Sequence, residues 1–276
     1  MGSEIGCAGL TALPFSNAGW LLTNLYWVQH FLDNRLGFAV GVVDVTDYVD
    51  VYGLINIWTD FNNYAFSTNP SIPAPDQGLG AAVRLMATEN FYLVGGIADA
   101  NGKPSDPGTF FDSFFNTAEY FTHLEAGWIS SWEKRFNDNV HLTAWHIDAR
   151  KQAGTKAGWG LAFSFSRLLA DTWEPFFRAG YSQDGGALWD RTVSAGLGYH
   201  TRKKSDVLGV GLNWSRPSQS TLGPGLRNQY TAEIYYRIQL LKVLAVTPSL
   251  QLLIHPAINP DQDMIAVFGL RARISF

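Results

Sequence analysis

Residues 264–276, MIAVFGLRARISF, decide how this chain folds. Every second position is apolar, and from the middle of the stretch onward the positions between them are small or charged. One face therefore carries Met264, Ala266, Phe268, Leu270, Ala272, Ile274 and Phe276. The other face carries Gly269, Arg271, Arg273 and Ser275. Because successive side chains of a β-strand point to opposite sides, a period of two predicts a strand with one apolar and one ionised face.

The same alternation recurs upstream, for example in 157–168, 228–241 and 243–255. Full charges stand in the middle of the polar faces, at Glu125, Asp148, Arg178, Glu233, Arg237 and Arg271. Aromatic residues stand near segment ends, at Trp128, Trp132, Trp159, Trp173, Tyr181, Tyr199, Trp214 and Tyr230. Segments of about ten residues with this pattern are typical of an antiparallel transmembrane β-barrel. A soluble β-sandwich also has one apolar face per strand and stays open as the alternative.

The composition agrees with an all-β chain and excludes several other classes. The 276 residues are 46% hydrophobic and 14% aromatic, which is too apolar for a disordered chain. The formal net charge is −4, so no nucleic-acid partner is expected. The single cysteine, Cys7, excludes a disulfide framework and a multi-cysteine metal site. No run approaches the roughly 18 apolar residues of a membrane helix.

Thirteen strands are predicted in one barrel domain, 20–276, after an unpatterned segment, 1–19. They span 20–32, 36–44, 79–87, 91–99, 120–132, 140–150, 157–168, 173–182, 189–200, 206–215, 228–241, 243–255 and 264–276. Short turns alternate with longer connections rich in Gly, Pro and Asn, as in bacterial barrels. Bacterial barrels have even strand numbers, and three further strands would restore this parity and give a barrel of about sixteen strands. We therefore expect a chain that is incomplete at its N-terminus, and residues 1–10 lack the pattern of a signal peptide.

Several motifs resemble the carbohydrate-selective outer-membrane porin family of the OprB type. They include Tyr230-Thr231-Ala232-Glu233, Thr247-Pro248-Ser249-Leu250-Gln251, Asn259-Pro260-Asp261 and the final Phe268 to Phe276. The segments 69–81 and Leu25-Tyr26-Trp27 with Phe31-Leu32-Asp33 also match. The resemblance covers most of 20–276 and implies a sixteen-stranded outer-membrane porin that admits sugars. One departure is Gly41-Val42-Val43-Asp44, where the family often has a basic residue after the glycine, so a pore-lining cation is expected to be absent here.

The connection 45–77 is about thirty residues long, and a loop of that length usually has a functional reason. By family resemblance it folds inward and narrows the lumen. Its expected constriction residues are Tyr48, Tyr52, Trp58, Asp60 and Tyr64. Aromatic rings suit the C–H faces of sugars, and the carboxylates interleaved with them suit the hydroxyls. The alternative is a surface loop that packs on its own aromatic residues.

Polar side chains on the inner face are the predicted pore lining. The core of this prediction is the cluster Arg237, Arg271 and Arg273, since few acids are expected near it and guanidinium is a rigid fork of donors. The further predicted lining residues are Glu233, Gln239, Arg178, Arg84, Glu125, His123, His146, Asp148 and Arg150. Inward charges that only pair with one another are the competing interpretation for each of them.

The sequence therefore favours a passive sugar channel in the bacterial outer membrane. Its expected partners are mono- or oligosaccharides and outer-membrane lipid, and the assembly stays open between a monomer and a homotrimer. A general non-selective porin is the alternative, followed by a barrel enzyme that uses His146, Asp148 and Glu125 with Ser131 or Ser164. No motif supports catalysis, and no cofactor or metal is expected. His141 and His146 are an odd number apart and should face opposite ways.

Overall fold

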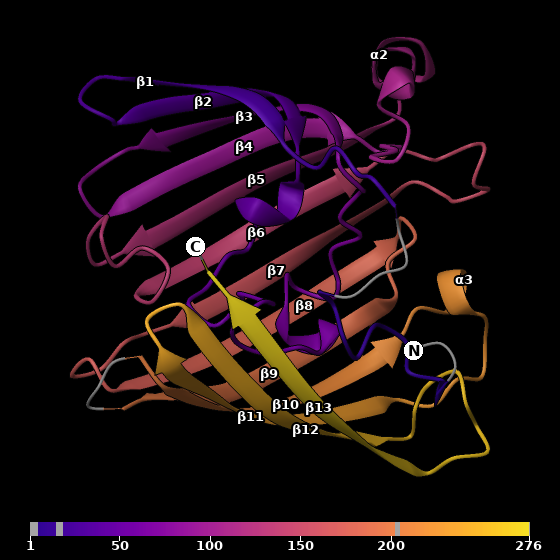
Figure 1. The fold of residues 1–276 in the computed structure, drawn as a ribbon. Coiled ribbons are helices and arrows are strands. Elements are labelled where there is room, and N and C mark those ends of the chain that lie inside the picture. The colour runs from indigo at the N-terminus through magenta and orange to yellow at the C-terminus, as the bar shows by residue number, and fades with distance from the viewer. Residues whose placement is uncertain (1–4, 15–18, 202–204, 276) are drawn as a thin grey trace.

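The computed structural model describes residues 5–14, 19–201 and 205–275. These residues form thirteen strands in one sheet, in which each strand pairs with the next in sequence order (Figure 1). The strands are β1 (Leu25–Phe31), β2 (Leu36–Val43), β3 (Gly78–Met86), β4 (Phe91–Asp99), β5 (Tyr120–Ile129), β6 (Asn139–Ile147), β7 (Gly158–Ser166), β8 (Trp173–Asp184), β9 (Trp189–His200), β10 (Val207–Pro217), β11 (Gln229–Leu241), β12 (Leu244–Ile254) and β13 (Met264–Ile274). All twelve pairings are antiparallel, and the two edge strands are β1 and β13.

From β1 onward, the short helical segments of the described residues lie in the connections between strands. They are η1 (Val45–Asp47), η2 (Tyr64–Phe66), η3 (Pro107–Thr109), α2 (Phe110–Asp112), η4 (Ser113–Thr117) and α3 (Gln219–Leu222). No helix in the described ranges is long and apolar enough to cross a membrane. The long connections leave one end of the sheet and the short turns leave the other, so the two ends differ (Figure 1).

The two faces of the sheet carry opposite chemistry, as the alternation predicts. Leu142 is 50% exposed, Leu212 is 62% exposed and Phe268 is 80% exposed, all on the outer face. Thr143, Ser164 and Thr231 are buried on the inner face, with the mid-strand charges Arg178 and Glu233. The register keeps these sets apart, since Thr231 pairs with Asn213 and Ile234 with Val210. The prediction of an antiparallel β-barrel fold with an apolar exterior is confirmed.

Glycines on the inner face make room for aromatic rings on the neighbouring strand. Gly209 is paired with Tyr235, Gly196 with Phe176, Gly160 with Trp145 and Gly127 with Tyr92. A Cβ at any of these glycines would lie within 2.6 Å of the partner ring. The rings therefore lie flat against the wall. Those of Phe176 and Tyr235 form a platform inside the sheet.

The strand boundaries differ from the predicted ones at several places, and two predicted lining residues lie elsewhere than expected. The first strand begins at Leu25 rather than at 20, and β6 ends at Ile147 rather than at 150. The prediction that His146 faces inward is wrong, because the buried residues of β6 are the odd-numbered ones. Asp148 lies past the strand end, where its carboxylate accepts the amide of Tyr120 at 2.9 Å, so it is a rim residue. Phe276 and residues 1–4 and 15–18 lie outside the described residues.

Candidate transport passage

The connection 45–77 between β2 and β3 folds into the space that the sheet encloses (Figure 1). Tyr52, Phe61 and Phe66 of this inward loop are at most 2% exposed. They pack on the aromatic platform, with ring centroids 5.3 Å apart for Tyr52 and Phe176 and 4.9 Å apart for Phe61 and Tyr235. Each such pair adds about 0.5–1.5 kcal/mol beyond the area that it buries. The inward loop is thus packed against β8 and β11 rather than on itself alone.

A buried ionic cluster holds the first half of the inward loop. The carboxylate of Asp50 pairs with the guanidinium of Arg178 on β8, which also donates to the carbonyl of Ser67. Asp50 Oδ1 lies 3.2 Å from His141 Nε2, and the amide of Asp50 donates to Glu125 Oε2 at 2.8 Å. Burial opposes ionisation of Asp50, but Arg178 and His141 outweigh it and lower the pKa of Asp50 below its usual value. Residues of β5, β6 and β8 therefore all bind the inward loop at Asp50.

A second buried cluster holds the middle of the inward loop, around Asp60. Asp60 Oδ1 accepts from Arg237 Nη1 and from the hydroxyl of Tyr235, both at 3.1 Å. The guanidinium of Arg271 donates to the carbonyls of Ile57 and Asp60. Burial raises the pKa of Asp60, and Arg237 only partly offsets this. The expectation that the arginine cluster faces few acids is therefore wrong for Arg237 and Arg271, which meet the loop acid Asp60 and the nearby Glu233.

Glu233 and the segment 5–14 complete the attachment of the inward loop. The carboxylate of Glu233 accepts the amides of Asn62 and Asn63 at 2.8 and 2.9 Å. The segment 5–14 runs between the loop and the wall, since its backbone carbonyl at Leu10 accepts the amide of Tyr64 at 2.9 Å. The same segment bonds to the inner faces of β11 and β12 through Gln229 and Gln251. Burial raises the pKa of Tyr64 to about 12.

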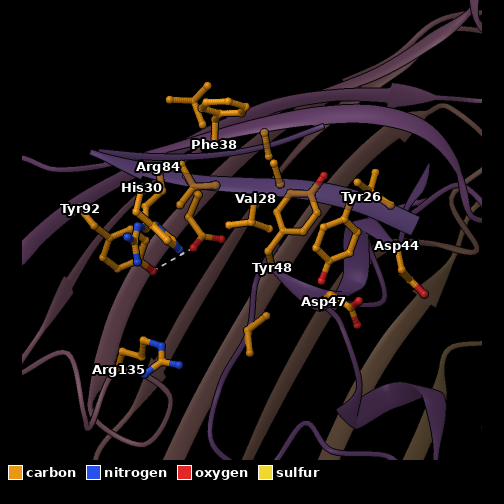
Figure 2. Close-up of a pocket in the computed structure, with 18 of the residues that line it drawn as sticks. Tyr26, Val28, His30, Phe38, Asp44, Asp47, Tyr48, Arg84, Tyr92 and Arg135 are labelled. Atoms are coloured by element: carbon orange, nitrogen blue, oxygen red, sulfur yellow. Dashed lines mark hydrogen bonds between the residues drawn. The ribbon is translucent and has the colours of Figure 1, made fainter. Parts of the chain in front are cut away.

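The inward loop leaves open space on the side of β1 to β5. One cavity of about 360 Å³ opens toward the short turns and is lined by the first five strands, the loop and the turn between β5 and β6 (Figure 2). A second cavity of about 1360 Å³ lies toward the long connections and is lined by residues that include Trp20, Asn56, Trp58, Gln77 and Arg150. Both cavities are lined by Asp44, Asp47 and Val51. These three residues mark the place where the two cavities meet.

Charge is distributed unevenly along the smaller cavity. Asp44, Asp47, Tyr26 and Tyr48 lie at one end, whereas His30, Arg84, Tyr92 and Arg135 lie at the other (Figure 2). Asp47 accepts from the amide group of Asn24 at 2.8 Å. Burial, opposed by Asn24 and reinforced by Asp44, raises the pKa of Asp47 above its usual value. The junction of the cavities is therefore acidic, and the short-turn end is basic.

The predicted lining residues fall into three groups. Arg178, Glu125, Glu233, Arg237 and Arg271 contact the inward loop, and His123 stacks on Tyr48 with centroids 5.5 Å apart. Arg84, Glu125 and Tyr48 line the smaller cavity, and Trp58, Tyr64 and Arg150 line the larger one. Gln239, Arg237 and Arg273 line a third cavity of about 220 Å³ beside Thr59. Tyr52 and Asp60, predicted in the constriction, are buried between the loop and the wall.

Several cavity residues were not among the predicted ones. Asp44 and Asp47 follow β2, which ends at Val43, so the alternation gives no direction to their side chains. Trp132 and Arg135 belong to a short turn that folds under the loop, since Asn139 Nδ2 donates to the carbonyl of Val51 at 3.2 Å. The departure from the family pattern in Gly41-Val42-Val43-Asp44, which predicted a missing pore-lining cation, was the one sequence signal near this place.

A single antiparallel sheet with an apolar outer face, a charged inner face and an inward-folded loop defines a porin. Solved porins share this fold. The high pH structure of Pseudomonas putida OprB has a TM-score of 0.78 at 17% identity and covers 98% of this chain and 77% of that chain. A triple mutant of Rhodopseudomonas blastica porin has a TM-score of 0.53 at 12% identity, covering 88% of this chain and 74% of that one.

Sequence comparison places the chain within one porin family. The model of the carbohydrate-selective porin, OprB family, matches residues 8–150 and 128–276. The chain belongs to this family, so the predicted resemblance is confirmed, and family and fold point to a channel rather than an enzyme.

Two curated relatives are porins as well. Porin AaxA of Chlamydia felis (strain Fe/C-56) is 26% identical over 223 residues, and Porin AaxA of Chlamydia abortus (strain DSM 27085 / S26/3) is 24% identical over 281 residues. These matches cover 78% and 99% of this chain. The chain spans 49% and 61% of the lengths of these two relatives.

Proposed function

We propose that this chain belongs to a channel through which sugars diffuse passively across the bacterial outer membrane. The observation that carries the proposal is that two cavities meet at Asp44, Asp47 and Val51 inside a sheet with an apolar exterior. Membership of the carbohydrate-selective porin family supports sugars as the solutes. The passage runs along the inner face of β1 to β5, whose residues line the smaller cavity.

Sugars suit the chemistry of this route. Trp58 is 56% exposed in the larger cavity, and Tyr26 and Tyr48 follow at the acidic junction. Aromatic faces contact the C–H faces of a pyranose, while the carboxylates of Asp44 and Asp47 accept its hydroxyls. Weak contacts of this kind slow a sugar without trapping it, and conduction requires that binding stay weak enough for release.

The predicted lining residues take two roles within this proposal. Tyr48, Trp58 and Arg84 contact the solute. Arg178, Glu233, Arg237 and Arg271 hold the inward loop in place and so set the width of the passage. Gln239 and Arg273 line a side cavity near the short-turn end.

Outer-membrane lipid is the proposed partner of the apolar face. Exposed leucines and phenylalanines such as Leu212, Leu270 and Phe268 match a hydrocarbon environment. Crosslinking in membranes distinguishes a monomer from a homotrimer, which would cover part of this face.

Planar-bilayer recording and liposome swelling test the proposal. We expect a passive ion current that glucose reduces in a saturable manner, and swelling in isotonic glucose. A current that glucose leaves unchanged at every concentration would assign a general porin. Absence of current from protein inserted in the bilayer would contradict the channel itself.

A further inference from the structure

The basic end of the smaller cavity is built around one indole. The guanidinium carbon of Arg84 lies 4.0 Å from the centre of the Trp132 ring, and that of Arg135 lies 4.4 Å from it. Arg84 comes from the inner face of β3, whereas Trp132 and Arg135 come from the turn between β5 and β6. Stacking on an aromatic face fixes the plane of a guanidinium and leaves its edge free to donate.

Most donors of these two guanidiniums have no partner within the described residues. Arg84 Nη2 donates to the carbonyl of Asn34 at 2.9 Å, and Arg135 Nη1 donates to the carbonyl of Trp132 at 2.8 Å. Each side chain carries five N–H donors. In the part of the chain that the structure describes, no salt bridge joins either of them to a carboxylate. Two partly buried guanidiniums therefore face the cavity without a salt-bridge partner among the described residues.

The nearby acids are committed elsewhere or lie away from this end. Glu125 lines the cavity, but its oxygens accept from Tyr92, Thr143 and the amide of Asp50. Glu133 is fully exposed on the turn, where it bonds to Ser131 and interacts with Arg135 only through solvent-exposed electrostatics, without a salt bridge. Asp44 and Asp47 lie at the opposite end of the cavity (Figure 2).

We propose that this end of the smaller cavity is a binding subsite for the carboxylate of an acidic sugar such as a uronate. The inference rests on the proposed function and names a substrate class for it. The paired arginines receive the carboxylate by charge-assisted hydrogen bonds. A pyranose ring then lies in the apolar middle of the cavity, along Val28, Ala39 and Val94. Its hydroxyls reach the acidic end, where carboxylates accept them.

The volume of the cavity and its two different ends favour an acidic sugar over a small anion. A volume of about 360 Å³ exceeds what a simple carboxylate needs and lies within the range of small-molecule sites. The separation of basic and acidic ends also suits a ligand that has a carboxylate on one side and hydroxyl donors on the other. Inorganic anions have no group for the second end.

Glucuronate and glucose form a matched pair of probes, because they share a ring and differ in one carboxylate. We expect glucuronate to bind the full chain in detergent about tenfold more tightly than glucose, measured by saturation-transfer NMR titration at pH 7. Arg135→Gln and Arg84→Gln should each lower the glucuronate affinity about tenfold, as expected for a lost hydrogen bond to a charge. Arg135→Gln should leave glucose affinity unchanged. Arg227→Gln, which removes the same charge on an outer loop, is the control and should change neither.

Three results would overturn the subsite. They are equal affinities for the two sugars, an unchanged glucuronate affinity in Arg135→Gln, and acetate binding as tightly as glucuronate, which would mark a simple anion site. Arg135→Lys keeps the charge and loses the planar fork, so its glucuronate affinity should lie between those of wild type and Arg135→Gln. It provides a second variant if Arg135→Gln inserts poorly. Binding in detergent does not need conduction. A chain that binds glucuronate but passes no current would therefore contradict the proposed function alone.

Discussion

Replacing Asp50 by Asn should release the inward loop from the wall. The variant keeps the shape of the side chain and removes its charge, so the guanidinium of Arg178 loses its partner. Both side chains are almost fully buried, at 0% and 2% exposure, so water cannot take the place of the carboxylate. Asp50 also accepts the amide of Asn69 at 2.7 Å and contacts His141, and both contacts weaken in the variant.

The expected cost follows from this burial. Breaking a buried ion pair by removing one partner destabilises a protein by about 3–5 kcal/mol. Replacing both partners by groups without charge is often close to neutral. We therefore expect Asp50→Asn to lose about 3–5 kcal/mol of unfolding free energy. Asp50→Asn combined with Arg178→Met should regain most of that loss.

Urea unfolding in lipid vesicles measures the free energies of unfolding. Single-channel recording measures the conductance, which reports whether the inward loop still narrows the passage. Asp50→Asn should show a larger and noisier conductance, because a detached loop no longer narrows the passage. The pKa of Asp50 is lowered, so its stabilising effect is present above the unfolded-state value and is lost as pH falls through the folded-state value. The wild type should therefore lose this stabilisation below about pH 4, and Asp50→Asn should not.

A double-mutant cycle provides the refutation. The coupling between Asp50 and Arg178 should be at least about 1.5 kcal/mol. Additive single effects, or an Asp50→Asn channel with wild-type stability and conductance, would show that this pair does not hold the loop.

Three further predictions concern the loop, the segment 5–14 and the outer face. The pKa of Asp60 is raised, so its contribution to stability is full below the unfolded-state pKa and is lost as pH rises through the folded-state pKa. Asp60→Asn should therefore flatten the fall in unfolding free energy as pH rises above the unfolded-state value of about 4, and an unchanged slope in this variant would contradict the assignment. Burial raises the pKa of Cys7 to about 11, so a maleimide at pH 7.5 should label the wild type very slowly. Gln229→Ala removes the hydrogen bond to Cys7, loosens the segment 5–14 and should speed labelling about tenfold. Equally fast labelling of the wild type would disprove the buried segment. Leu212→Arg should destabilise the folded barrel in lipid by about 2–4 kcal/mol, as measured by urea unfolding, and a neutral result would place this residue away from lipid.

The wall of the molecule could be predicted from the sequence because a strand permits only two directions. Once Phe268 and Arg271 are assigned to opposite faces, every other residue of the strand follows. The inward positions of Glu125, Arg178, Glu233 and Arg237 could be predicted in this way. His146 was misplaced because the even-numbered face of β6 was taken as the inner one, and Asp148 because the strand was extended by three residues beyond its end.

The partners of the inward charges could not be predicted in the same way. Asp60 lies 177 positions from Arg237 in the chain, within a loop that has no periodic pattern. No local signal gives such a contact, so the arginines were expected to stay free for solute. The position of Arg135 could not be predicted either, because the sequence of a short turn is the same whether the turn points outward or folds under the loop.

Chemical modification at the junction of the two cavities tests the central claim most directly. The variant Asp47→Cys, in a chain that also carries Cys7→Ala, should react with a water-soluble polymer maleimide added to the side of the long connections. We expect this reaction to abolish both the current and glucose permeation, whereas labelling of Gln152→Cys on an outer connection should change neither. Undiminished current and glucose flux after complete labelling at position 47 would contradict a passage beside this residue.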